Sequence, residues 1–448
     1  MIHDFGAITC DINSSVPITH THTHRQPRSL HPAFVADNAF MAPKTSGMDW
    51  PDLVAAVRRA STPAEAGEGE AEALPTGACA APAGAAAADA QAERAFAAVA
   101  AVAESAAKGG HGAAAACGAF GTVIAAMAAH LAHADVQHAA CSALHLLCSS
   151  VDADGIARMQ LAVDAGALDA VLAAMRAHSA HAGIQEMACR TLCNACYGID
   201  VAGLSRKQAA ADAGALEAIA AAMAAHHEHC GVQEEACRAL CNICAGGDAG
   251  GLVREHLAVK AGALTTIISA VSLHVELEGV VELACWALHT LCYGSDEAAF
   301  ARQEYAVREG ALRAVTDAML AHAANAGVQE SGCWALCNLC CCTNSTGLWI
   351  RHLAFHAGAL AAVIVAMGVH LAHPGVQQEA CRALFVLCWG GDAQAASRRE
   401  VAVRMRAPDA VLAAMRNHGA SVGVQRNARM ALNLLGSKPM LVASCSHS

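Results

Sequence analysis

Aromatic residues are scarce in this sequence: they make up 4% of its 448 residues, although 55% of the residues are hydrophobic. Much of the hydrophobic fraction is alanine, which is the strongest helix former. A core that lacks bulky rings is built from close contacts between helices. The composition therefore excludes a core of packed aromatic side chains and predicts an all-α protein.

Positive charge is also in short supply. The chain has 28 lysine and arginine residues against 39 aspartate and glutamate residues, so its formal net charge is -11. Proteins that bind nucleic acid draw much of their affinity from an excess of lysine and arginine. We therefore expect no nucleic-acid partner.

A secretory signal is lacking as well. The first residues, MIHDFGAITCDINSS, contain neither a basic start nor a long apolar run. The second residue is not the glycine that N-terminal acylation requires. Disulfide scaffolds are typical of short secreted chains, so we expect the 22 cysteines to be reduced thiols. These features together predict an intracellular protein of the cytoplasm, the nucleus or both.

What the sequence does contain is a repeat with a period of 48 residues. Histidine recurs without a gap, and methionine recurs three residues before it in every copy except one, where Val271 stands. The histidines are His130, His178, His226, His274, His322, His370 and His418. A period of this size, held over so many copies, indicates stacked repeats that bury their apolar faces against one another.

Each copy contains the pattern of three helices. Residues 215–227 place apolar side chains on one helical face, and residues 232–244 do so again after a break at Gly231. A short helix precedes this pair, and a recurring aspartate such as Asp200 is expected to cap it. The arginines of the short helix are expected to be solvated or paired with carboxylates: Arg158, Arg206, Arg254, Arg302, Arg351 and Arg398.

The repeat divides the chain into four segments. We predict an N-terminal tail at 1–62 with a short helix at 48–60, a linker rich in alanine, glycine, proline and glutamate at 63–87, a solenoid at 88–435 and a C-terminal tail at 436–448. Residues 88–105 match the last helix of the repeat and are predicted to form a partial N-terminal cap. In the last copy, Arg429 replaces a cysteine and Arg406 replaces a glycine, as expected of a polar terminal repeat.

One apolar run, from Ala357 to Ala372, approaches the length of a membrane span. Its equivalents in other copies carry the charged residues Arg176, Glu217 and Asp317. We therefore interpret the run as a buried helix of the solenoid and predict no transmembrane segment.

Motifs of catalysis are absent outside the repeats: we find no glycine-rich phosphate loop, nucleophile elbow or catalytic triad. The spacing CxxxCxxC occurs three times and matches the motif of radical iron–sulfur enzymes, but other copies place His145, His289 or Phe385 at its middle position. We interpret these cysteines as small hydrophobic core residues. Four HxxH pairs offer too few ligands for a stable zinc site. The sequence thus predicts a protein that is no enzyme and has no cofactor or metal, with a metal or iron–sulfur enzyme as the least favoured alternative.

The segments AGALxxIxxAM and GVQEEACRALCNIC together resemble the armadillo repeat family, which includes importin-α, β-catenin and vacuolar armadillo proteins. The resemblance implies a right-handed superhelical solenoid of seven three-helix repeats plus a partial N-terminal capping repeat. It also implies a protein–protein interaction scaffold that holds extended peptides in a concave groove formed by the third helices. A karyopherin-like cargo adaptor and a membrane-organelle adaptor are the alternatives.

Two positions of the third helix, four residues apart and so on one face, match the Trp and Asn array of that groove. An Asn carboxamide can hold a peptide main chain because it both donates and accepts hydrogen bonds. The alternative is that these asparagines only fix neighbouring backbone within the solenoid. The candidate groove residues are Arg190, Asn194, Arg238, Asn242, Trp286, Trp334, Asn338 and Arg382.

Arginine stands in several tryptophan places of this array. Arginines in the groove would disfavour basic cargo and favour acidic or phosphorylated segments. We therefore expect a protein or peptide partner, acidic or phosphorylated, bound to a monomeric solenoid.

Overall fold

The computed structural model describes residues 49–62, 83–116, 118–150, 152–246 and 249–436. Within these ranges the regular secondary structure is helical throughout, from α1 to α23, and no strand occurs. The prediction of an all-α solenoid is therefore confirmed. Residues 1–48 of the predicted N-terminal tail (1–62), residues 437–448 of the predicted C-terminal tail (436–448) and most of the predicted linker at 63–87 lie outside the described residues.

Helices α3 to α23 follow one another as triplets in which the first, second and third helix alternate. The first helices are α3 (His111–Ala116), α6 (Ala153–Asp164), α9 (Val201–Asp212), α12 (Ala249–Lys260), α15 (Glu297–Arg308), α18 (Ser345–His356) and α21 (Ala393–Arg404). The second helices are α4 (Ala119–Ala129), α7 (Ala167–Ala177), α10 (Ala215–Ala225), α13 (Ala263–Leu273), α16 (Ala311–Ala321), α19 (Ala359–Val369) and α22 (Ala407–Asn417). The third helices are α5 (Ala134–Leu147), α8 (Ala182–Ala195), α11 (Cys230–Cys244), α14 (Glu278–Leu291), α17 (Ala326–Leu339), α20 (Pro374–Cys388) and α23 (Val422–Leu435).

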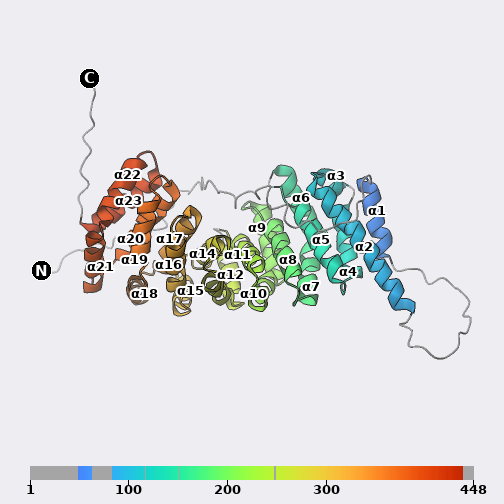
Figure 1. Cartoon of the computed structure of the whole chain (residues 1–448), viewed down its shortest axis with the longest axis horizontal. Coiled ribbons are helices and arrows are strands. Elements are labelled where there is room, and N and C mark those ends of the chain that lie inside the picture. The colour runs from blue at the N-terminus through green and yellow to red at the C-terminus, as the bar shows by residue number, and fades with distance from the viewer. Residues whose placement is uncertain (1–48, 63–82, 117, 151, 247–248, 437–448) are drawn as a thin grey trace, which may run out of the picture. The chain divides into compact units, whose positions relative to one another are not determined.

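The third helices pack directly on one another in chain order, from α5 through α23 (Figure 1). The second helices form another stack, in which each contacts the second helix of the next triplet. Each also packs against the third helix of its own triplet. Buried alanine, leucine, valine and cysteine side chains fill the space between them in one continuous core. Small side chains let the helices approach closely, as the shortage of aromatic residues predicted.

The solenoid begins earlier than predicted. The sequence predicts a tail over 1–62, but helix α1 (Trp50–Ser61) within it packs against α2 (Ala83–Ala107) and α4. Its Val54 and Val57 are buried in the common core. The pair α1 and α2 therefore supplies the second and third helices of the partial repeat. The sequence interval between the two helices hid this relation, because it breaks the 48-residue spacing.

A glycine in left-handed conformation separates the first and second helices of most triplets. Its φ angle is 92° at Gly166 and 95° at Gly310, values that glycine adopts at low cost because it has no Cβ. In the last triplet Arg406 occupies this turn with a φ of 62°, and it is the one non-glycine residue with positive φ in the described part of the chain. The terminal repeat thus keeps the turn but carries a residue that strains it.

The recurring histidines connect neighbouring triplets. In each one the Nε2 atom of the ring lies between 2.6 and 3.0 Å from a backbone carbonyl oxygen of the preceding layer. The recurring glutamine of the third helix has a complementary role. The Gln185 side-chain amide donates to the carbonyl oxygens of Met175 and His178, at the end of the second helix. These bonds satisfy carbonyls that the helix end leaves without partners.

The predicted aspartate caps are confirmed at the first helices. Asp152, Asp200, Asp296 and Asp392 each accept a hydrogen bond from the backbone N–H three residues later. The arginines of these helices were expected to be solvated or paired with carboxylates. Solvation is wrong, because all six are buried, whereas Arg302 does pair with Glu255, at 2.7 Å. Arg206, for example, donates to the carbonyl oxygens of Ala195 and Tyr197 at the end of the preceding third helix. A cation is favourable there because the helix dipole is negative at that end.

Two further findings concern apolar helices. Among the described residues, no single helix is both long and apolar enough to cross a membrane. Two bent pairs, α12 with α13 and α18 with α19, reach that length and composition only when each pair is taken together.

Candidate functional site

We call the stacked faces of the third helices that carry the eight candidate residues the third-helix row. The candidates come from α8, α11, α14, α17 and α20, which are successive neighbours in the stack. The structure places them in two groups of different chemistry, one on α8 and α11 and one on α14 and α17. Arg382 on α20 lies beyond the second group.

The first group is a set of ion pairs, here called the charged cluster: Glu186, Arg190, Glu234, Glu235 and Arg238. Glu235 joins the two arginines, because its carboxylate lies 3.0 Å from Nε of Arg190 and 3.3 Å from Nε of Arg238. Its side chain is only 7% exposed. Each arginine also contacts a glutamate one turn earlier on its own helix, at 3.1 Å for Arg190 and 3.0 Å for Arg238.

The positive and negative charges of the charged cluster nearly cancel. Two arginines face three glutamates, and both arginine side chains are mostly buried, with 23% and 24% of their area exposed. Burial raises the pKa of Glu234, and the nearby Arg238 opposes this rise. The guanidinium groups that were expected to attract an acidic partner are thus already paired within the solenoid.

The candidate asparagines bind the preceding third helix. The Asn194 side-chain amide donates to Nδ1 and to the backbone oxygen of His145, at 3.0 and 3.2 Å. The Asn242 amide donates to the backbone oxygen and the sulfur of Cys193, both at 3.1 Å. These N–H donors are therefore used between repeats, as the alternative interpretation of the asparagines stated.

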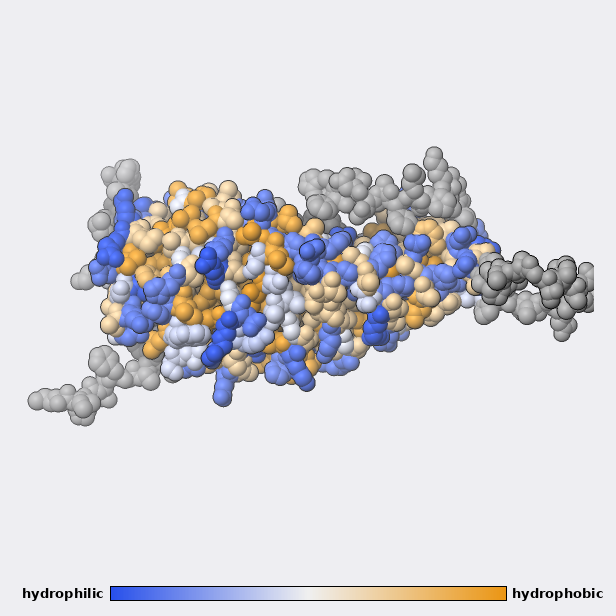
Figure 2. Space-filling model, turned by 60° about the horizontal axis from the view of Figure 1, so that its bottom comes forward, coloured by the Kyte–Doolittle hydropathy of each residue, from blue (hydrophilic) through white to orange (hydrophobic). Residues whose placement is uncertain are grey.

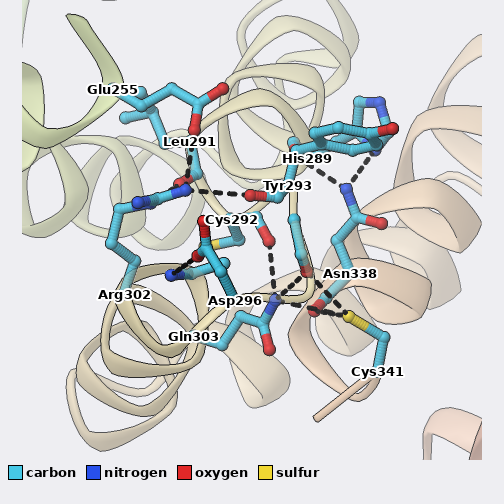
Figure 3. A network of polar contacts seen from close by, with 12 residues as sticks. Glu255, His289, Leu291, Cys292, Tyr293, Asp296, Arg302, Gln303, Asn338 and Cys341 are labelled. Carbon is cyan, nitrogen blue, oxygen red and sulfur yellow. Dashed lines mark hydrogen bonds and ion pairs between the residues drawn. The ribbon is translucent and has the colours of Figure 1, made fainter. Parts of the chain in front are cut away.

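Asn338 repeats this arrangement in a more buried setting. Its amide nitrogen lies 2.9 Å from both Nδ1 and the backbone oxygen of His289, and the residue is 2% exposed (Figure 3). The imidazole must be neutral at Nδ1 to accept this bond. For the equivalent His145, burial lowers the pKa to about 4, with a further contribution from Arg190, so that ring stays neutral at pH 7.

The second group is an aromatic cluster of Trp286, His289, Tyr293 and Trp334. The rings of Trp286 and Trp334 meet edge to face with centroids 6.0 Å apart. His289 stacks on Trp334 at 4.9 Å, and Tyr293 lies against His289 at 6.3 Å. Both tryptophans are half-buried and Tyr293 is 48% exposed, so part of each ring system faces solvent.

Arg382 stands apart from the charged cluster. Its nearest carboxylate oxygen, on Glu379, is 3.7 Å away, which is longer than the contacts of Arg190 and Arg238. The side chain is 32% exposed. Among the candidate arginines it is therefore the one whose charge is least neutralised by a close partner.

The residues that sequence reasoning missed are Glu235, His145, His289 and Tyr293. Residue spacing does not reveal the role of Glu235, because its partner Arg190 lies on the preceding third helix. For the two histidines, the sequence pattern predicts only that they replace a core cysteine. The signal that could have found them is their position: each lies one layer before an asparagine of the array.

The cysteine and HxxH motifs have structural roles. Burial raises the pKa of the Cys193, Cys196 and Cys340 thiols to about 12, so these side chains stay protonated and pack as apolar groups. In three of the four HxxH pairs the ring Nδ1 of the second histidine accepts a backbone N–H at the start of the third helix, at His181, His229 and His373. Within the described ranges no group of three or more His, Cys, Asp or Glu side chains could hold a metal ion.

Comparison with known proteins gives two family matches. A model described as "LRRK2 ARM repeat" matches residues 254–444, and one described as "Armadillo/beta-catenin-like repeat" matches residues 206–245. No curated protein matches the chain. A chain of a solved structure described as "A conserved phosphorylation switch controls the interaction between cadherin and beta-catenin in vitro and in vivo" is 13% identical, with a TM-score of 0.46 over 87% of this chain and 69% of that chain.

Proposed function

The chain is an armadillo repeat protein, and we propose that it is a non-catalytic interaction scaffold that binds an extended segment of a partner protein along the third-helix row. The observation that carries the proposal is the row itself. Successive third helices present partly exposed tryptophan and arginine side chains at one repeated position. These residue types dominate the binding energy of protein interfaces.

Within the row, we assign the main anchor to the aromatic cluster. Trp286 and Trp334 each have a ring that is held by a neighbour and still partly exposed. A ring fixed in this way loses little conformational entropy when a partner packs on it. In the charged cluster a partner would instead have to displace the carboxylates that already pair with Arg190 and Arg238.

The chemistry of the partner follows from this division. Apolar or aromatic side chains would pack on Trp286 and Trp334, and an acidic or phosphorylated group would pair with Arg382. The site that would bind the partner's acidic group is thus Arg382 on α20, and not the arginines of α8 and α11. This order of contacts predicts a segment with apolar residues followed or preceded by an acidic group.

The test uses 12-residue peptides selected by display on the full chain. Their affinity is then measured for wild type, for Trp286→Ala with Trp334→Ala, and for Arg190→Gln with Arg238→Gln. We expect at least a tenfold loss in the tryptophan variant and less than about threefold in the arginine variant, since tenfold corresponds to ~1.4 kcal/mol. Equal affinity of wild type and the tryptophan variant would overturn the proposal, and selection of lysine-rich peptides would favour the karyopherin-like alternative.

An asparagine variant is a weaker test of the same idea. Asn242→Ala with Asn338→Ala removes hydrogen bonds to the preceding third helix as well as any contact with a peptide. Loss of binding would then have two explanations. The tryptophan pair avoids this problem because its rings lie partly in solvent.

A further inference from the structure

The outer face of α23 differs from that of every earlier third helix. Helices α5, α8, α11, α14, α17 and α20 each have a following third helix packed on them. No element of the described chain covers α23 in this way. A hollow of about 560 Å³ lies on the uncovered face, lined by Gly419, Ala420, Val422, Gln425, Arg426, Arg429, Met430 and Asn433.

The residues of this hollow are both apolar and basic. Val422 is 82% exposed and Met430 is partly exposed. Arg429 occupies the position of Cys381, which is fully buried one layer earlier, and Arg426 occupies that of Gln378. In the described part of the chain neither arginine side chain has a hydrogen bond or a carboxylate partner, so two unpaired cations flank an exposed apolar surface.

The charge of the last triplet is opposite to that of the chain. Residues 393–436 contain seven arginines and two acidic residues, a net of 7 - 2 = +5, whereas the whole chain has -11. The remainder therefore carries -11 - 5 = -16. The end of the molecule that holds α21 to α23 shows strongly hydrophilic side chains beside apolar surface (Figures 1 and 2).

We propose that this face is a second docking site, separate from the third-helix row, and that its occupant is an acidic amphipathic α-helix of a partner protein. A helix fits because each equivalent face in the stack receives a helix. An apolar stripe would cover Val422 and Met430, and carboxylates beside that stripe would pair with Arg426 and Arg429. A cap that only solvates the end of the stack would not expose valine and methionine beside its arginines.

The test measures binding of a labelled synthetic peptide to the full chain by fluorescence anisotropy. The peptide has 15 residues, with leucine at helical spacing i, i+3, i+4 and i+7 and glutamate on its flanks, and a matched peptide carries lysine instead. The binding variant is Arg426→Glu with Arg429→Glu. The control is Arg308→Glu with Arg313→Glu, which makes the same charge change at residues that are 65% and 83% exposed on other helices.

We expect the glutamate peptide to bind wild type and the control with the same affinity within twofold. The binding variant should lose at least tenfold, and the lysine peptide should not bind. Equal loss in both variants, or no preference for glutamate over lysine, would overturn the proposal. Thermal unfolding of each variant establishes that a loss of binding does not come from unfolding.

Two other occupants would also overturn it. A dimer in sedimentation velocity that disappears in Arg426→Glu with Arg429→Glu would assign the face to a second copy of this chain. Tighter peptide binding after removal of residues 437–448 would assign it to the chain's own C-terminal segment. The variant Trp286→Ala with Trp334→Ala should bind the glutamate peptide normally, so this site and the third-helix row fail or succeed independently.

Discussion

The charged cluster on α8 and α11 and the aromatic cluster on α14 and α17 are each built around one position of the third helix, in successive copies of the repeat. Arg190 and Arg238 stand where Trp286 and Trp334 stand two layers later. In both regions an asparagine binds the preceding third helix, as Asn194 binds His145 and Asn338 binds His289. The backbone arrangement is therefore shared, and the difference lies in the side chains that face outward.

This difference separates stability from recognition. In the charged cluster each guanidinium is paired with carboxylates of the solenoid. These ion pairs connect neighbouring helices and leave little unpaired charge for a partner. In the aromatic cluster the rings contact one another and still leave area in solvent. Substitutions in the first cluster should mainly change the free energy of unfolding, and substitutions in the second should mainly change binding.

The largest effect is expected for Glu235→Ala. It removes the carboxylate between Arg190 and Arg238 and leaves two mostly buried cations without this partner. We expect unfolding in urea to show a loss of about 3 kcal/mol. Glu235→Gln keeps the shape and serves as the matched variant. A loss below about 0.5 kcal/mol would show that the cluster behaves as an exposed set of ion pairs.

The next effect concerns pH and the ring of His145. Its pKa is lowered from 6.5 to about 4 in the folded state, so the unfolded state binds more protons between these values. Stability is therefore complete above pH 6.5 and falls as the pH decreases toward 4, by roughly 3 kcal/mol. His145→Phe, which copies Phe385 at the equivalent position, should remove this part of the pH dependence. An unchanged pH profile of the unfolding free energy in His145→Phe would contradict the assignment.

A smaller effect separates the two asparagines. Asn338→Ala removes the buried amide that donates to the backbone oxygen and to Nδ1 of His289, and we expect a loss of about 2 kcal/mol. Asn242 is only partly buried, so Asn242→Ala should cost about 1 kcal/mol. Thermal unfolding of the two variants measures the difference. The reverse order would show that burial does not set the strength of these contacts.

The smallest effect on stability is expected for Trp286→Arg. It places in α14 the residue that α11 carries at the same position, and the arginine stem can cover part of the surface that the ring covered. We expect a loss below about 1 kcal/mol in unfolding, together with at least a tenfold loss of affinity for the selected peptides. If peptide binding survives this substitution, Trp286 does not distinguish the aromatic cluster from the charged cluster in partner binding.

Much of the fold could be predicted from the sequence because the copies of the repeat can be compared with one another. A position that recurs every 48 residues shows its role by what it tolerates, and the histidine series and the aspartate caps were recognised in this way. The role of the histidines in joining layers could not be predicted, because each ring contacts a backbone carbonyl, and every residue type has one. Helix α1 was assigned to the tail for the related reason that it stands outside the period.

The candidate site was less predictable. Spacing identified the partly exposed tryptophan and arginine positions of the third helices, but it could not show that Glu235 lies between two arginines from different helices. It also could not show which surface an asparagine side chain faces. Asn338 has donor and acceptor atoms suited to a peptide, and only the packing of α17 on α14 directs its donor to His289.

Tryptophan fluorescence tests directly whether a partner binds at Trp286 and Trp334. The chain has five tryptophans, so replacing Trp50, Trp349 and Trp389 with phenylalanine leaves these two as the only reporters. We predict that a display-selected peptide shifts and changes the emission of this variant, with a midpoint equal to the dissociation constant measured independently. Full binding without any change in emission would contradict it.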